Sequence, residues 1–374
     1  MSAARIIRAF CTLAFSLTVL GSGYAETNVI KLGFIGPLSG NTASYGNDER
    51  NAIVMAVEKI NSSNYIPGKK LEVVFEDGRC SGKDAAIAAR KLIKIDKVKI
   101  ILGGACSGET LAAAPVAEKA KVILYSVFSS HPDITDAGDY IFRVVPSDAV
   151  GARAAAKDTI KRGYRTVGII TENSDYAIGF RKVFASAVEQ GGLKIVADEF
   201  FNPAESDYRS ILLRMRKKMP ELVLLNPQSG TTAGLLIKQI KELGWEVPLF
   251  GTFVMSTADT HTTAGGIKAL EGIRFVDVPE VSSERGKRFL KTFLEKYPPA
   301  QTNFAATLRY DSVYIIADAI KAVGLNTEQI RDYLYKMPLY EGVAFNYRFD
   351  KNGDVSGVPY PVKMIKGGKV IELD

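Results

Sequence analysis

The chain has 374 residues, of which 47% are hydrophobic and 24% are charged, and its formal net charge is +7. This length is too great for one ordinary core and indicates two domains of conventional size. The basic residues are scattered singly or in pairs, as in Lys69-Lys70 and Lys217-Lys218, and no basic block is interleaved with aromatic residues. This distribution argues against a nucleic-acid partner.

Residues 1–25 have the pattern of a cleaved secretory signal. Arg5 and Arg8 precede an apolar run over residues 9–20, and the small residues of Gly21-Ser-Gly-Tyr-Ala25 favour cleavage after Ala25. The run is too short to span a bilayer, and no later segment approaches the roughly 20 apolar residues that a membrane helix needs. We therefore expect a periplasmic mature chain with a net charge of +5, without direct insertion into a membrane.

Two cysteines, Cys80 and Cys106, remain in the mature chain, because Cys11 lies inside the signal. In an exported protein an isolated pair of cysteines is most economically a disulfide. Two unpaired buried thiols are the alternative.

Strands and helices alternate along the mature chain, a pattern that predicts parallel sheets covered on both faces. The alternation occurs twice, with a short link at residues 144–147, which predicts two similar lobes over a cleft. A helical region and two strands joined by a turn follow. The expected strands are 29–36, 71–76, 100–103, 122–125 and 140–145, then 166–170, 194–197, 222–225 and 248–251, and finally 342–349 and 360–365.

Polar turns follow two neighbouring strands of the first series. The run Ile100–Gly104 leads into Cys106 and Ser107. Ser107 suits an N-cap, and the free amide groups at the start of the helix behind it can hold an anion. The strand 122–125 opens into Ser129 and Ser130. We expect the ligand at these two strand ends, although serines that only cap helices are the alternative.

Motifs for catalysis or metal binding are absent from the sequence. The two histidines, His131 and His261, do not lie in a metal-binding helix motif or beside a glycine-flanked nucleophilic serine. Residues 78–83 lack the spacing of a phosphate loop, and residues 33–36 lack the third glycine of a dinucleotide fingerprint. We therefore expect no enzyme activity, no metal site and no cofactor.

Five motifs in order along the mature chain resemble the leucine/isoleucine/valine-binding family of periplasmic solute-binding proteins. The resemblance implies an α/β, two-lobed, type I periplasmic binding protein in which three crossovers hinge two parallel sheets flanked by helices. It also implies the Cys80–Cys106 disulfide. The motifs are Ile30-Lys-Leu-Gly-Phe-Ile-Gly-Pro-Leu-Ser-Gly40 with Tyr45-Gly46, Asp77 to Cys80, Gly103 to Ser107, Ser129 to Thr135, and Phe142-Arg143.

Members of this family capture a small ligand between the lobes and deliver it to the permease subunits of an ABC importer. For this chain the resemblance implies a first lobe of residues 26–146 plus 277–355 and a second lobe of residues 147–276 plus 356–374. We expect it to act as a monomer.

The resemblance also assigns roles to individual residues. Ser107 and Ser130 correspond to hydroxyl residues that bind the ligand carboxylate, and Phe128 stands where a backbone carbonyl receives the ammonium. Further pocket positions are Tyr45 and Tyr176, which cover the ligand from the two lobes, and Gln228 or Ser229.

Phe253 departs from the family pattern, because amino-acid binders place a glutamate there to face the ammonium. Burying an ammonium without an anion costs several kcal/mol, so Asp175, otherwise a helix N-cap, is a candidate substitute. Alternatively, Phe128 and Phe253 with the two tyrosines form a pocket for a hydrophobic or aromatic carboxylate. The ligand is therefore a branched-chain amino acid, a hydrophobic relative or an aromatic carboxylate. A ligand-sensing receptor subunit would share the fold, but we expect no membrane helix.

Overall fold

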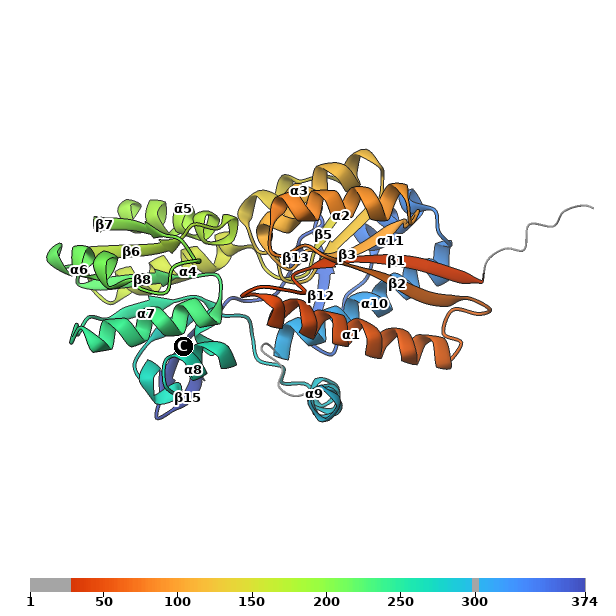
Figure 1. Cartoon of the computed structure of the whole chain (residues 1–374). Coiled ribbons are helices and arrows are strands. Elements are labelled where there is room, and N and C mark those ends of the chain that lie inside the picture. The colour runs from red at the N-terminus through yellow and green to blue at the C-terminus, as the bar shows by residue number, and fades with distance from the viewer. Residues whose placement is uncertain (1–27, 298–302, 374) are drawn as a thin grey trace, which may run out of the picture.

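A computed structural model describes residues 28–297 and 303–373, so the predicted signal segment lies outside the described residues. The chain forms two lobes side by side (Figure 1). A five-stranded sheet in the order β2-β1-β3-β4-β5 defines the first lobe. A seven-stranded sheet in the order β15-β14-β10-β9-β8-β6-β7 defines the second lobe.

The first lobe is built from alternating strands and helices, and all of its strand pairs are parallel. Its central strands β3 and β4 are buried at every residue, because helices cover both faces of the sheet. The elements are β1 (Val29–Gly36), α1 (Ala43–Ser62), β2 (Lys70–Asp77), α2 (Gly82–Lys94), β3 (Ile100–Gly103), α3 (Ser107–Lys119), β4 (Ile123–Ser126), η1 (Pro132–Asp136) and β5 (Ile141–Arg143).

The second lobe repeats this alternation, and its strands β6 to β10 pair in parallel. Serine side chains cap several of its helices, for example Ser174 at α5 and Ser229 at α7. The elements are α4 (Asp148–Lys161), β6 (Thr166–Glu172), α5 (Asp175–Gln190), β7 (Lys194–Phe201), α6 (Arg209–Lys217), β8 (Leu222–Asn226), α7 (Gly230–Glu242), β9 (Leu249–Gly251), η2 (Phe253–Ser256), α8 (Ala258–Thr263), η3 (Ile267–Leu270) and β10 (Arg274–Val276).

The last part of the chain returns to the first lobe and then crosses back, so the chain passes between the lobes three times. Helix α10 packs against α1, and a small sheet, β11-β12-β13, lies beside β5 through a bridge between Arg143 and Asp354. The elements are α9 (Glu284–Lys296), α10 (Asn303–Val323), α11 (Thr327–Lys336), β11 (Tyr340–Glu341), β12 (Asn346–Phe349), β13 (Val355–Ser356), β14 (Val362–Lys366) and β15 (Lys369–Glu372).

The turn expected between the two final strands forms, but the strands at residues 346–349 and 362–366 do not pair with each other. The side chain of Asp350 accepts hydrogen bonds from the backbone N–H groups of Asn352 and Asp354, so the chain reverses within a few residues. Strand β12 therefore pairs with the short β13. Strand β14 instead joins the second lobe, antiparallel to both β10 and β15.

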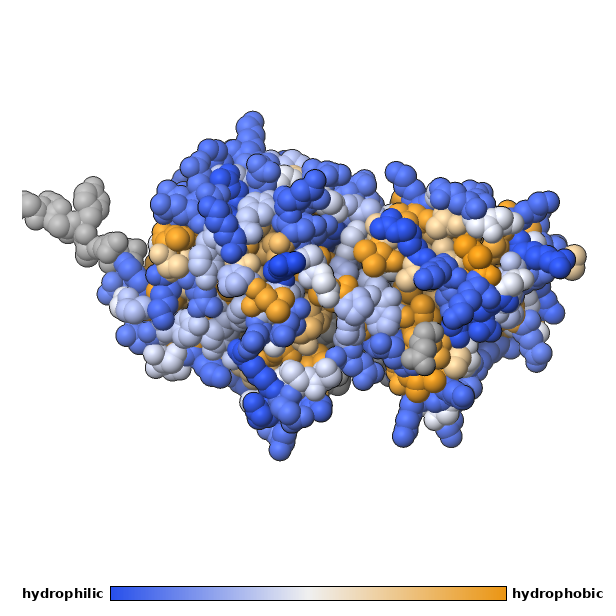
Figure 2. All heavy atoms as spheres, turned by 180° about the vertical axis from the view of Figure 1, so that it is seen from behind, coloured by the Kyte–Doolittle hydropathy of each residue, from blue (hydrophilic) through white to orange (hydrophobic). Residues whose placement is uncertain are grey.

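The outer surface is mostly hydrophilic on the face shown in Figure 2, with apolar residues in separate patches. Within residues 28–297 and 303–373, no helix combines the length and the apolar character needed to cross a bilayer. The largest hydrophobic cluster continues from one lobe into the other. The part of this cluster between the lobes contains the four aromatic residues that the family resemblance assigns to the ligand pocket.

Candidate functional site

Four aromatic residues from both lobes meet between the sheets, and we call them the aromatic cluster. Tyr45 on α1 and Phe128 after β4 belong to the first lobe, whereas Tyr176 on α5 and Phe253 in η2 belong to the second. The ring of Phe253 lies 5.1 Å from that of Phe128 and 5.7 Å from that of Tyr176, measured between centroids. Each residue is at most 9% exposed. The structure therefore brings together all four aromatic residues proposed from sequence.

Ser107 lies beside this cluster as the first residue of α3. The N-cap is Cys106, one residue earlier than the sequence suggested. The hydroxyl oxygen of Ser107 accepts a hydrogen bond from the backbone N–H of His131 at 3.2 Å. Within the described part of the chain its own O–H has no acceptor and is available as a donor to a ligand. A hydroxyl donor at the positive end of a 13-residue helix suits a carboxylate.

Ser130 is buried and donates its hydroxyl proton to Asp148 Oδ2 at 2.8 Å. Asp148 begins α4, and its backbone N–H donates to the carbonyl oxygen of Ser130 at 2.8 Å. Burial raises the pKa of Asp148 to about 7, against the opposing effect of the Ser130 hydrogen bond.

Two other serines at the same strand end hold the backbone together. The hydroxyls of Ser126 and Ser129 each donate to the carbonyl oxygen of Gly104 at 2.8 Å. Thr110 on α3 also lies 2.7 Å from the Ser129 hydroxyl. These bonds join the ends of β3 and β4, so Ser129 has a structural part in shaping the site.

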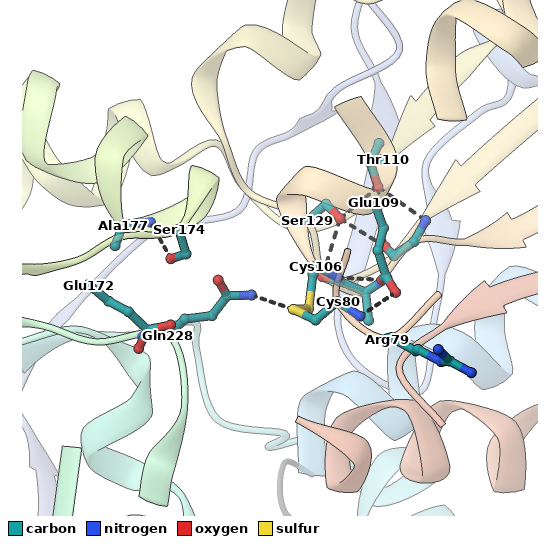
Figure 3. Close-up of a disulfide and its surroundings, with 12 residues drawn as sticks. Arg79, Cys80, Cys106, Glu109, Thr110, Ser129, Glu172, Ser174, Ala177 and Gln228 are labelled. Carbon is teal, nitrogen blue, oxygen red and sulfur yellow. Dashed lines mark hydrogen bonds between the residues drawn. A yellow bond between two sulfur atoms is a disulfide. The ribbon is translucent and has the colours of Figure 1, made fainter. Parts of the chain in front are cut away.

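A disulfide joins Cys80 and Cys106 with a Cα–Cα distance of 5.3 Å. The carboxylate of Glu109 accepts hydrogen bonds from the backbone N–H groups of both cysteines, each at 3.0 Å (Figure 3). Burial raises the pKa of Glu109 to about 7. From the second lobe, Gln228 donates its amide N–H to Cys80 Sγ at 2.8 Å. The disulfide thus lies at the cleft and fixes the start of α3.

Replacing both Cys80 and Cys106 by serine is expected to lower the free energy of unfolding by about 3–4 kcal/mol. The disulfide closes a loop with a sequence separation of 26, and the chain-entropy relation gives this magnitude. Urea denaturation with and without a reductant measures this loss, since the reductant should lower the free energy of unfolding of the wild-type protein alone. Equal stability of the two proteins under oxidising conditions would contradict the prediction.

A second, more open part of the cleft lies outside the aromatic cluster, and we call it the outer chamber. Its volume is about 560 Å³, and of the ligand-site residues proposed from sequence Gln228, its alternative Ser229 and the candidate acid Asp175 line it. Glu172 also lines it, with a pKa that burial raises to about 7. Its wall further includes Asn41, Arg79 and both cysteines of the disulfide.

The lobes also touch where the ring of His131 packs against Gly179 of α5. A Cβ atom at Gly179 would lie 2.3 Å from His131 Cδ2, so a larger residue here would force the ring or the helix to move. The ring is held in place because its Nδ1 accepts a hydrogen bond from the backbone N–H of Asp133 at 3.0 Å. Burial lowers the pKa of His131, which favours the neutral ring at this contact.

Replacing Gly179 by valine is expected to weaken ligand binding about 10- to 100-fold, because the side chain forces the lobes apart. Overpacking typically costs about 1–3 kcal/mol, and here the cost falls on a contact between the two lobes. Calorimetry with a ligand of the wild-type protein measures the loss. Gln190→Val, at the exposed end of the same helix, should leave affinity unchanged. Equal affinity for both variants would show that this contact between the lobes does not contribute to ligand binding.

The family model described as periplasmic binding protein matches residues 29–369. The chain belongs to this family. Its members are non-enzymatic transport binding proteins, and the family assignment confirms the sequence-based expectation of a solute-binding protein of the ABC transporter type. The match covers both lobes, so it includes every element that contributes to the site.

Individual relatives match over nearly the whole chain. The leucine-, isoleucine-, valine-, threonine-, and alanine-binding protein of Pseudomonas aeruginosa is 26% identical, covering 96% of this chain and 95% of the relative. A Streptococcus pneumoniae branched-chain amino acid binding protein, solved with isoleucine, is 29% identical with a TM-score of 0.80, covering 92% and 100% of the two chains. A Rhodopseudomonas palustris solute binding protein, solved with 3,4-dihydroxybenzoic acid, is 23% identical with a TM-score of 0.82, covering 92% and 96%, and shows the fold.

Proposed function

We propose that the chain is the periplasmic substrate-binding component of an ABC importer. It captures a branched-chain amino acid or a related small hydrophobic carboxylate between its two lobes. The first lobe comprises residues 26–146 plus 277–355, and the second comprises residues 147–276 plus 356–374. The protein then delivers the ligand to the permease subunits. The observation that carries this proposal is the interlobe aromatic cluster beside the start of α3, with both lobes contributing rings.

The chemistry of the site supports a ligand with an apolar body and one carboxylate. Ser107 and the first amides of α3 supply donors for the carboxylate, and the four rings supply an apolar wall. The amino acids named for the Pseudomonas and Streptococcus relatives have this form. Phe253, where the family places a glutamate, favours an aromatic carboxylate as the second candidate.

A thermal-shift and calorimetry series on the mature chain tests the proposal with leucine, isoleucine, valine and benzoate. A ligand at 100 times its dissociation constant adds about 2.7 kcal/mol of stability. Ser107→Ala should lower the affinity for whichever of these ligands binds by about 10-fold or more, because a hydrogen bond to a charged group is lost. The exposed Ser63→Ala is the matched control. Absence of binding to all four compounds would refute the proposal.

A further inference from the structure

We propose that a pocket between the start of η1 in the first lobe and helices α4 and α5 in the second binds a small multivalent oxyanion, either phosphate or a polycarboxylate. We call it the basic pocket. Its wall includes His131 and Asp133 from the first lobe and Arg153, Gly179 and Lys182 from the second, and its volume is about 320 Å³. It shares no lining residue with the outer chamber or the aromatic cluster, so the inference stands apart from the proposed function.

The two cations of the basic pocket are unpaired within the described part of the chain. Arg153 on α4 and Lys182 on α5 make no ion pair and no side-chain hydrogen bond to any residue that the structure describes. By contrast, Arg181, the residue before Lys182, pairs with Asp198. Two unpaired cations that line one cavity attract an anion, and they attract an anion with two or more charges most strongly.

A buried N–H group lines the same cavity. His131 is 8% exposed, and its Nδ1 accepts a hydrogen bond from the backbone N–H of Asp133. The neutral ring therefore carries its proton on Nε2, on the edge that faces Gly179. No acceptor for this N–H lies among the described residues. Leaving a buried donor unpaired is unfavourable, and an oxygen of a bound anion satisfies it.

The acids near the basic pocket leave this N–H and the two cations open. Asp133 is the only acid among the lining residues, and its side chain is 71% exposed and lies 4.0 Å from Nδ1 of His131 rather than beside Nε2. Water therefore screens it. Burial lowers the pKa of His131 most; the charges of Asp133 and Asp175 oppose this effect, and those of Arg143 and Lys182 reinforce it. The Lys182 charge thus acts on the same ring that offers the N–H.

The size and the lining of the basic pocket indicate the class of anion. Ligand pockets have volumes of roughly 300–1,000 Å³, so this one is large enough for phosphate or for a polycarboxylate such as citrate. Both anions carry several oxygens, which can accept hydrogen bonds from His131, Arg153 and Lys182 together. Such an anion contacts both lobes and therefore stabilises the arrangement of the lobes seen in this structure.

Titration of the untagged mature chain with phosphate, citrate and chloride at constant pH and ionic strength tests the inference. The ring resonances of histidine report on the pocket directly, since the chain has two histidines and His261 on α8 does not line it. Phosphate or citrate should shift the His131 resonances in a saturable way, with a dissociation constant of about 1 mM, and chloride should not. The two titrations show which oxyanion the pocket prefers, and His261 should not respond.

Variants that change the charge of the wall connect this response to the basic pocket. Arg153→Gln combined with Lys182→Gln should weaken anion binding about 10-fold, because both cations are lost. Asp133→Asn should strengthen it about 2- to 5-fold, because a repelling charge is removed. The matched control combines Lys161→Gln with Lys194→Gln, which removes two exposed charges of the second lobe outside the pocket and should leave the affinity unchanged.

Two results would overturn the site. Equal losses in the pocket variant and its control would show that net charge alone attracts the anion. His131 resonances that stay fixed at the highest concentrations of both oxyanions would show that the pocket is not occupied, and this result needs no variant to fold. Neither result bears on ligand capture at the aromatic cluster, which titration of the same protein with leucine and benzoate measures separately.

Discussion

Replacing Arg309 by methionine is expected to lower the free energy of unfolding by about 3–5 kcal/mol, because the change leaves a carboxylate buried without its partner. Arg309 and Glu49 are both fully buried, and Arg309 Nε donates to Glu49 Oε2 at 2.9 Å. A further guanidinium nitrogen donates to the carbonyl oxygen of Tyr125 on β4 at 3.2 Å. The pair therefore fastens α10, which returns from the second lobe, to α1 and the first sheet.

Urea denaturation of the single and double variants measures this contribution. Replacing both partners, as in Arg309→Met with Glu49→Leu, should recover most of the stability, since no charge then remains buried. The exposed pair of Lys296 and Glu58 also joins a returning helix to α1, so Lys296→Met is a matched surface control with little expected change. A loss for Arg309→Met as small as that of the control would show that water reaches Glu49 in the folded protein.

Much of the first lobe was predictable from sequence, because its signals are local. A short run of apolar residues that ends in glycine and serine identifies β3 and the start of α3 without any long-range information. The placing of Tyr45, Tyr176 and Phe253 came from the resemblance, and the structure puts their rings in contact across the cleft. Strand ends of parallel sheets gather in this way, since their loops share one edge.

The features that sequence reasoning missed depend on pairings between distant segments. The bond from Ser130 to Asp148 joins the end of β4 to the start of α4, and the pattern of residues 146–148 does not show which side chain Asp148 will contact. The side chain of Gln228 donates a hydrogen bond to Cys80, which lies 148 positions earlier in the sequence. The wrong partner expected for the last strands has the same origin. The alternating pattern of β14 predicts a strand but does not determine which strand it pairs with.

Replacing Phe253 by glutamate is expected to have opposite effects on the two candidate ligand classes. If the ligand is an aromatic carboxylate, the new carboxylate meets a like charge in a buried site, and binding should fall about 100-fold or more. If the ligand is an amino acid, the glutamate offers its ammonium an acid, so leucine binding should persist or improve. Phe253 contacts three other rings of the site, so the change reaches any ligand held there.

Calorimetry with leucine and benzoate on the same preparations separates these effects, and Phe253→Leu supplies the control for lost ring contacts. Leucine at this position keeps an apolar wall but leaves a smaller side chain, so it should weaken both classes moderately through the cavity it creates. A Phe253→Glu protein that loses leucine binding while it keeps benzoate binding would place Phe253 outside the ligand site. Equal losses for Phe253→Glu and Phe253→Leu would show that packing alone, and not charge, determines what this residue contributes.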